Sequence, residues 1–167
     1  MDAEMKKTAL RMVPYGLYIL TAEDKQGRMA ASAVSWVTQS SFDPPQIAIA
    51  IKENSLTHNI VKDSNAFVLN MLRKDQASIA PTFYKTLEPE GNTIGGEPFF
   101  KGKTGSPIFQ NAPAFIECTV VGSLEKGDHS VFVAEVVDAG VRQQPEGRPD
   151  DSILLVKDLG EKTFYSG

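Results

Sequence analysis

Residues 32–59, SAVSWVTQSSFDPPQIAIAIKENSLTHN, place a run of Ser, Thr and Gln between two apolar runs and then add a polar turn. The hydroxyl-rich run belongs to a segment of β-formers, residues 29–42, which we expect to form one long or bulged strand. The prolines in residues 43–45 should end that strand, because proline lacks the N–H that a strand ladder needs. The apolar run 46–52 predicts the next strand, buried on both faces.

The rest of the chain predicts further strands separated mostly by turns. Because consecutive strands are joined by turns and not by long helices, the sheet should be largely antiparallel. Six or seven strands could close into a barrel or nearly so, which leaves few exposed edges. Residues 86–112 form a long Gly- and Pro-rich loop, and such loops are often functional. The expected strands are 15–24, 66–72, 114–127, 129–141 and 152–167, and the expected short helices are 2–12, 54–65 and the first part of 74–86.

Length and composition predict a single globular domain, residues 1–167. The net charge is −4 and no basic cluster is present, so nucleic acid is not an expected partner. No run reaches the roughly 20 apolar residues of a membrane span, and no signal peptide is expected. The single cysteine, Cys118, excludes a disulfide framework and is expected to be a buried thiol, which favours a reducing cytoplasm.

Several common kinds of catalytic or nucleotide site find no support in the sequence. The two histidines, His58 and His129, are far apart, without metal-ligand spacing or a G-x-S-x-G motif. No metal site is therefore predicted. The glycine motifs of Rossmann and P-loop proteins are missing as well.

The spacing within residues 32–59 favours a different nucleotide site. A strand of small hydroxyl residues can lie flat against a planar heterocycle, and its N–H groups can donate to ring carbonyls. Downstream, Lys52 is followed by Asn54, Ser55 and Thr57 at the start of a helix, where free N–H groups attract anions. The alternative that spacing leaves open is a polar strand edge followed by an ordinary capped helix.

Two blocks of sequence resemble a known family. Residues 31–72, ASAVSWVTQSSFDPPQIAIAIKENSLTHNIVKDSNAFVLNML, and residues 117–136, ECTVVGSLEKGDHSVFVAEV, resemble the flavin reductase-like family with the FMN-binding split-barrel fold. The run SWVTQSSFDPP is especially similar to flavoredoxin and to flavin reductase modules associated with flavodiiron proteins. The chain has no Cys-x-x-Cys pair, so no rubredoxin segment is included.

The resemblance implies a mainly β fold, a Greek-key split β-barrel with a few short helices, which forms a homodimer. It implies that FMN, or FAD as in some relatives, is the cofactor and that NADH or NADPH donates the hydride. The chain would then be a flavin oxidoreductase that passes electrons onward, with a rubredoxin or flavodiiron protein as redox partner. The first alternative is a flavoredoxin-like electron-transfer protein without a nicotinamide site, reduced and oxidised by protein partners. The other is a split-barrel protein for haem or pyridoxal phosphate.

Carried over by position, the resemblance also implies site residues. His129 would face the nicotinamide side of the ring as the catalytic residue, with a turn histidine as the alternative. His58 would donate to a phosphate or be a solvated helix residue, and Trp36 is expected to be largely a core residue. Residues bordering the isoalloxazine would be Ala33, Val34, Ser35, Trp36, Val37, Thr38 and Gln39, and those holding the ribityl and phosphate groups would be Lys52, Asn54, Ser55, Leu56 and Thr57. The aromatic residues Phe83, Tyr84, Phe99 and Phe100 would cover the flavin or pack as a satellite cluster.

Overall fold

The computed structural model describes residues 1–165. Its strands are β1 (Tyr18–Glu23), β2 (Met29–Val34), β3 (Val37–Phe42), β4 (Pro45–Lys52), β5 (Ala66–Met71), β6 (Thr93–Ile94), β7 (Glu97–Lys101), β8 (Pro107–Phe109), β9 (Ala114–Glu125) and β10 (His129–Val141). Its helices are α1 (Ala3–Arg11), α2 (Leu56–Ser64) and α3 (Pro149–Ser152), and its 3-10 turns are η1 (Lys74–Gln76), η2 (Ala80–Tyr84) and η3 (Val156–Leu159).

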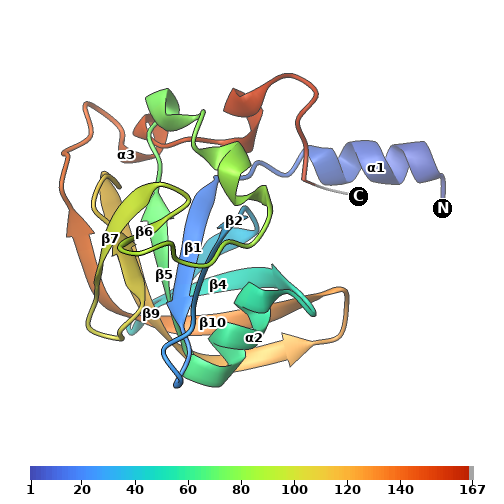
Figure 1. Cartoon of the computed structure of the whole chain (residues 1–167). Helices are drawn as coiled ribbons and strands as arrows, with labels where there is room; N and C mark the ends of the chain where they lie inside the picture. Colours follow the sequence, from blue (N-terminus) through green and yellow to red (C-terminus); the bar gives the residue numbers. More distant parts are fainter. Residues whose placement is uncertain (166–167) are drawn as a thin grey trace.

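The main sheet has seven antiparallel strands in the order β2-β1-β5-β9-β10-β4-β3 (Figure 1). Its two edge strands, β2 and β3, are consecutive in sequence and are separated only by Ser35 and Trp36. The sheet must therefore curl until its edges meet at these two residues. The mainly β, antiparallel architecture predicted from the sequence is confirmed. The opening between the edge strands β2 and β3 is the split of the barrel.

The hydroxyl-rich segment 29–42 forms two strands, so the prediction of one continuous strand is wrong. The chain breaks at Ser35, whose carbonyl accepts from the N–H of Val37 at 3.1 Å in a tight turn. The carbonyl of Trp36 then accepts from the N–H of Ala50 at 3.0 Å, which attaches the new strand beside β4. The change of edge, and not a proline, interrupts the strand.

The strand β4 is buried on one face only, which corrects the prediction that both faces are buried. Ile47, Ile49 and Ile51 point into the core, while Ala48 and Ala50 between them stay partly exposed. The strands that lie between two cores are β1 and β5, whose residues are buried almost throughout. A central position in the sheet, with packing on each side, explains this pattern.

The first core fills the barrel and the second lies on the opposite face of β1. Leu20 and Phe67 belong to the first core, which α2 covers with Ile60 and Val61. Ile19 faces the second core, together with the set Leu17, Ala31, Leu72, Ala80, Phe83, Ile94, Phe109, Ala112, Leu154 and Val156.

Residues 86–112 contain a small three-stranded sheet, β6-β7-β8, so the prediction of a loop is wrong for much of this range. Phe83 and Phe109 are both buried, with ring centroids 5.5 Å apart, and Phe99 packs against the same core. The satellite cluster of aromatic residues expected as one alternative is thus present for Phe83 and Phe99. Phe100 is 44% exposed and lies under the guanidinium of Arg142.

The segment 152–165 does not form the predicted final strand, and residues 166–167 of that prediction lie outside the described residues. Leu154 is fully buried; its N–H donates to the carbonyl of Leu72 at 2.7 Å and its carbonyl accepts from Leu17 at 3.1 Å. Leu154 is thus bonded to the chain on both sides, near residues 17 and 72. The segment forms only isolated β-bridges there and then continues into η3.

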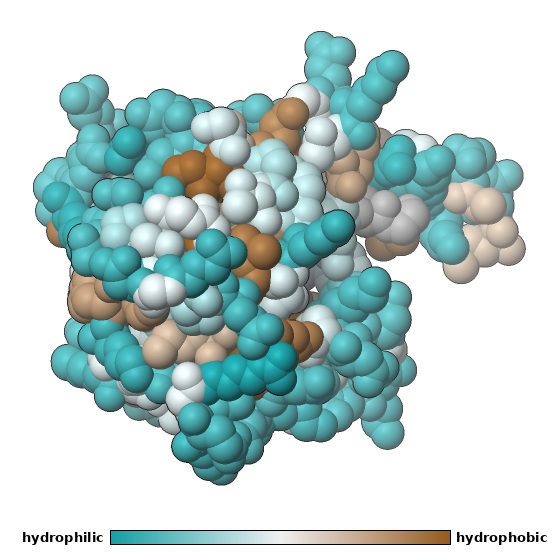
Figure 2. Space-filling view, viewed as in Figure 1, coloured by the Kyte–Doolittle hydropathy of each residue, from teal (hydrophilic) through white to brown (hydrophobic). Residues whose placement is uncertain are grey.

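In Figure 2 the visible face is largely hydrophilic, and α1, which buries none of its residues, extends away from the rest of the molecule. Within residues 1–165, no helix combines the length and the apolar character that crossing a membrane would require.

Cys118 is buried as predicted, and burial, with the charge of Glu117, raises the pKa of its thiol to about 12.

Candidate functional site

A cavity of about 430 Å³ opens at the split of the barrel, beside the end of β2. Its volume lies in the range of small-molecule sites, which is roughly 300–1,000 Å³. The walls come from β2, β4, the start of α2, η2, β10 and the C-terminal segment. The lining residues are Leu17, Ser32, Ala33, Val34, Ser35, Ala50, Ile51, Lys52, Ser55, Tyr84, Thr86, His129, Val156, Leu159, Thr163, Phe164 and Tyr165.

Three of the residues predicted to border a flavin ring, Ala33, Val34 and Ser35, form one wall of this cavity. The Oγ atom of Ser35 is buried and has no hydrogen-bond partner among residues 1–165. A buried hydroxyl without a partner costs roughly 1–3 kcal/mol, so such groups usually bond to a ligand or to water. This wall therefore fits a planar ligand with polar atoms at its edge, as a flavin has.

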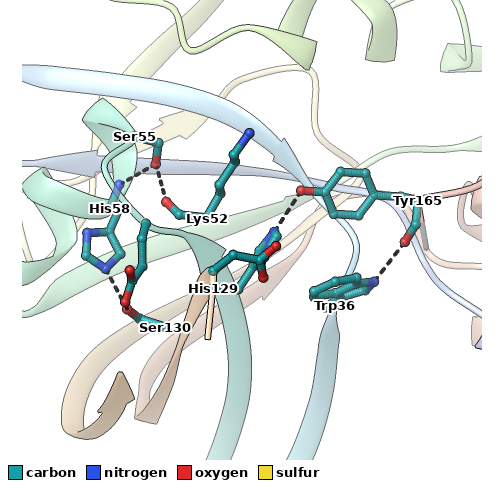
Figure 3. A network of polar contacts seen from close by, with 9 residues as sticks. Trp36, Lys52, Ser55, His58, His129, Ser130 and Tyr165 are labelled. Carbon is teal, nitrogen blue, oxygen red and sulfur yellow. Dashed lines mark hydrogen bonds and ion pairs between the residues drawn. The ribbon is translucent and has the colours of Figure 1, made fainter. Parts of the chain in front are cut away.

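The part of the cavity lined by Lys52 and Ser55 suits an anion. The Oγ atom of Ser55 accepts from the N–H of His58 at 3.1 Å and donates to the carbonyl of Lys52 at 2.9 Å, which caps α2 (Figure 3). The first N–H groups of a helix have no partner within it and carry a partial positive charge. Lys52 forms no ion pair within the described part of the chain. Together these groups fit the phosphate of a mononucleotide.

Thr57 lies behind the cavity wall instead of lining it. Its buried hydroxyl oxygen lies 2.9 Å from that of Ser32 and 3.4 Å from that of Thr86. Ser32 and Thr86 both line the cavity, so Thr57 holds two hydroxyls that face it. The sequence interpretation missed Ser32, although alternation along β2 places it on the same face as Val34.

His129 begins β10 and pairs in register with Lys52, the last residue of β4. Its Nδ1 lies 2.8 Å from a carboxylate oxygen of Asp128, and its Nε2 lies 2.8 Å from the hydroxyl of Tyr165 (Figure 3). The hydrogen bond from the His129 ring is the largest cause of the lowered pKa of Asp128. Because a carboxylate only accepts, Nδ1 donates to Asp128, and Nε2 of the neutral ring accepts from Tyr165.

Trp36 lies beside His129, outside the cavity lining. Its ring centroid is 4.5 Å from that of His129 and 5.3 Å from that of Tyr165, and its Nε1 donates to the backbone carbonyl of Tyr165 at 3.0 Å. The side chain is half-buried. Trp36 thus connects the split of the barrel to the C-terminal segment.

The remaining predicted residues are not brought to the cavity. His58 turns toward β10, where its Nε2 lies 2.8 Å from the Oγ of Ser130 (Figure 3), and it lines a separate polar hollow that also includes Asn54. Asn54 adopts a left-handed φ of 60°, which an Asn tolerates at a turn. Four more predicted residues do not line the cavity. They are Val37, Thr38 and Gln39 on β3, and Leu56, which packs against the first core.

Tyr84, the last residue of η2, lines the cavity, in agreement with one alternative for the loop aromatic residues. Thr86, which follows η2, was not foreseen, and neither were Thr163, Phe164 and Tyr165 of the C-terminal segment. The only sequence signal for the latter was a pair of adjacent aromatic residues in a short polar segment. Among residues 1–165, no group of three His, Cys, Asp or Glu side chains is placed to hold a metal ion.

Comparison with models of protein families shows which family the chain belongs to. Residues 10–158 match the family model of the flavin reductase like domain, so the chain belongs to the flavin reductase family. The prediction of this family is thereby confirmed.

Related sequences differ widely in length. The ferric-chelate reductase (NAD(P)H) of Archaeoglobus fulgidus is 36% identical over 148 residues, which cover 87% of this chain and 85% of the relative. Diflavin flavoprotein A 1 of Synechocystis is 31% identical over 142 residues, which cover 84% of this chain but only 24% of the relative. For the high molecular weight rubredoxin of Moorella thermoacetica, at 31% identity over 144 residues, the values are 85% and 62%. The chain thus spans about a quarter of the length of the diflavin relatives.

Solved structures agree with the fold. The styrene monooxygenase flavin reductase of Pseudomonas putida S12 superposes with a TM-score of 0.70 at 24% identity, covering 92% of this chain and 91% of that one. An FMN-binding protein from Thermus thermophilus, solved with bound p-hydroxybenzaldehyde, gives 0.71 at 25% identity, with 84% and 79% covered. The predicted split-barrel fold is confirmed by these similarities.

Proposed function

We propose that this protein is an FMN-binding flavin oxidoreductase that accepts hydride from NADH or NADPH. The observation that carries the proposal is the cavity at the split, which combines a buried Ser35 hydroxyl, without a partner among residues 1–165, with Lys52 and the N-cap Ser55 of α2. A ring site and a phosphate site within one cavity are what a mononucleotide requires. FMN is favoured over FAD because Lys52 and the N-cap Ser55 form a single anion site, which suits the one phosphate of FMN.

The protein's own groups have limited tasks in such a reaction. When bound, the flavin supplies the hydride-accepting chemistry, and the protein supplies binding and orientation. Lys52 and the free N–H groups at the start of α2 would hold the phosphate, and Ser35 and the backbone of β2 would hold the ring edge. His129, fixed by Asp128, offers Nε2 as an acceptor for an amide N–H, such as that of a nicotinamide carboxamide.

The printed names of two similar proteins support this proposal. One relative is named a ferric-chelate reductase (NAD(P)H), and one structural neighbour is named an FMN-binding protein. These names concern those proteins, and here they favour nicotinamide as the donor and FMN as the cofactor.

A second candidate function is a flavin-carrying electron-transfer protein without a nicotinamide site. It is favoured by the position of Tyr165, which occupies Nε2 of His129 on the side where a nicotinamide would lie. The diflavin and rubredoxin relatives also favour exchange of electrons with a rubredoxin or flavodiiron protein. In that case protein partners, and not NADH, would reduce the flavin.

We further propose that residues 1–167 act as one domain in a homodimer in a reducing cytoplasm. Apolar side chains are exposed on strands of the barrel, among them Phe42 on β3 at 90% and Leu124 on β9 at 58%. A partner copy would cover this surface, which a monomer leaves in water. Sedimentation of the protein with and without FMN would establish the oligomeric state.

The decisive experiment begins with the absorption spectrum of the purified protein after incubation with excess FMN and removal of free flavin. We expect a bound flavin spectrum, and an anaerobic titration with NADH or NADPH should bleach it. Bleaching only with reduced rubredoxin or a flavodiiron protein would favour the second candidate. A protein that takes up no FMN at all would contradict both.

A further inference from the structure

The last described residues form a cover over one side of the cavity, which we call the C-terminal strap, residues 163–165. All three residues line the cavity. Tyr165 binds through its backbone carbonyl to Nε1 of Trp36 at 3.0 Å and through its hydroxyl to Nε2 of His129 at 2.8 Å. The strap runs next to α1 (Figure 1), and the guanidinium of Arg11 lies 4.5 Å from the ring centroid of Phe164.

The strap is half-buried and is attached by a small set of contacts. Phe164 is 47% exposed and Tyr165 is 48% exposed, so about half of each residue already faces water. The two hydrogen bonds of Tyr165 add to the contacts of its ring with Trp36 and His129. A segment held in this way can be displaced by a ligand that replaces one of its bonds.

The bond to His129 specifies what such a ligand must offer. Asp128 accepts from Nδ1, so in the neutral ring Nε2 presents a lone pair and bonds only to a donor. Burial and the charge of Asp128 raise the pKa of Tyr165, which keeps its hydroxyl in the donating form. An amide N–H can take over the same bond with the same polarity, whereas a carboxylate cannot.

We propose that the C-terminal strap is a gate in which the Tyr165 hydroxyl competes with the amide of the incoming nicotinamide for Nε2 of His129. The inference rests on the proposed function, because it names the regulation of that same site. With the strap closed, His129 is occupied and this side of the cavity is covered. With the strap open, His129 is free to orient the carboxamide. The net value of one hydrogen bond makes this competition worth about two- to tenfold in apparent nicotinamide affinity.

The cover can be tested without flavin, because Trp36 is the single tryptophan of the chain and touches the strap. Acrylamide quenching of its fluorescence in flavin-free protein should increase in Tyr165→Phe and increase further in Tyr165→Ala. Tyr84→Phe, which changes another tyrosine of the same cavity, should leave quenching unchanged. If His129→Ala has the effect of Tyr165→Phe and the double variant adds nothing, the bond between them holds the strap. Equal quenching in all the variants would overturn the proposal.

The competition is tested on the FMN-loaded protein with NADH. Tyr165→Phe should lower the KM for NADH about two- to tenfold, with kcat and the Kd for FMN changed less than about twofold. A lower kcat at unchanged KM would overturn the gate and make Tyr165 a positioning residue for His129 in the reacting complex. If NADH fails to bleach the flavin of every variant, the proposed function fails and the competition with it. The quenching would still decide whether the strap covers the cavity.

Discussion

The hydroxyl oxygens of Ser32 on β2 and Thr57 on α2 lie 2.9 Å apart behind the wall of the cavity. In the proposed FMN site, the strand carries the wall that would bind the ring, and the helix start carries the groups that would bind the phosphate. Their bond therefore fixes the distance between the two halves of the proposed FMN site. A residue that touches no ligand can in this way control affinity for one.

Replacement of Thr57 by Val should weaken FMN binding by about fivefold. The change keeps the shape of the side chain but leaves Ser32 and Thr86 without their shared partner, at a cost of about 1 kcal/mol. Thr57→Ser keeps the hydroxyl and should retain most of the affinity. Quenching of FMN fluorescence on titration measures both Kd values, and equal weakening in the two variants would show that the methyl group, not the bond, matters.

Replacement of Lys52 by Ala should weaken FMN binding about tenfold and leave riboflavin binding unchanged. Only FMN carries the phosphate that a lysine ammonium would bind, and a tenfold loss corresponds to about 1.4 kcal/mol. Lys62→Ala is the matched control, because Lys62 is already paired with Glu125 at 2.8 Å. Isothermal titration with both ligands gives the comparison. A similar loss for riboflavin would place the contact of Lys52 at the ring or ribityl chain.

The strands could be predicted from the sequence because their signals are local. Alternation of β-formers and the prolines at 44 and 45 located most of β3 and β4. The break at Ser35 and Trp36 could not be predicted, because the residues around it are all compatible with a strand. It arises from the pairing of Trp36 with Ala50, which depends on closure of the whole sheet.

The same distinction applies to the site. The cavity contains Ser35, Lys52, Ser55 and His129, which the resemblance had indicated by position. Tyr165 was not indicated, because its bonds to residues 36 and 129 join parts of the chain that only the tertiary fold brings together.

Glu117 is fully buried on β9 and should be a major determinant of stability. Its carboxylate accepts from the N–H groups of Lys103 and Thr104 at 3.0 and 2.6 Å and from the Thr104 hydroxyl at 2.6 Å. Glu117→Gln replaces one acceptor oxygen by a donor facing these N–H groups, which should cost about 2–3 kcal/mol. For a domain of this size the melting temperature should fall by about 5–10 °C. Glu125→Gln, on the exposed part of the same strand, should shift it far less, and equal shifts would contradict the assignment.

Cys118 should make the stability of the protein depend on pH in the alkaline range. Burial raises the pKa of its thiol from 9.0 to about 12, so above pH 9 the unfolded chain loses a proton that the folded chain retains. The unfolded state then binds fewer protons, and the free energy of unfolding falls as the pH rises from 9 toward 12, by at most about 1.4 kcal/mol per pH unit. Below pH 9 the thiol is protonated in both states and contributes no slope.

The comparison of wild type with Cys118→Ala isolates this effect, because tyrosines and lysines titrate in both proteins. Urea unfolding at pH 8, 9 and 10 should show the difference between the two free energies shrinking above pH 9, since only the wild type carries the thiol. The alanine variant will be less stable at pH 8 through lost packing, so the change in the difference is the relevant quantity. A difference that stays constant from pH 8 to 10 would mean that the folded thiol ionises as readily as the unfolded one.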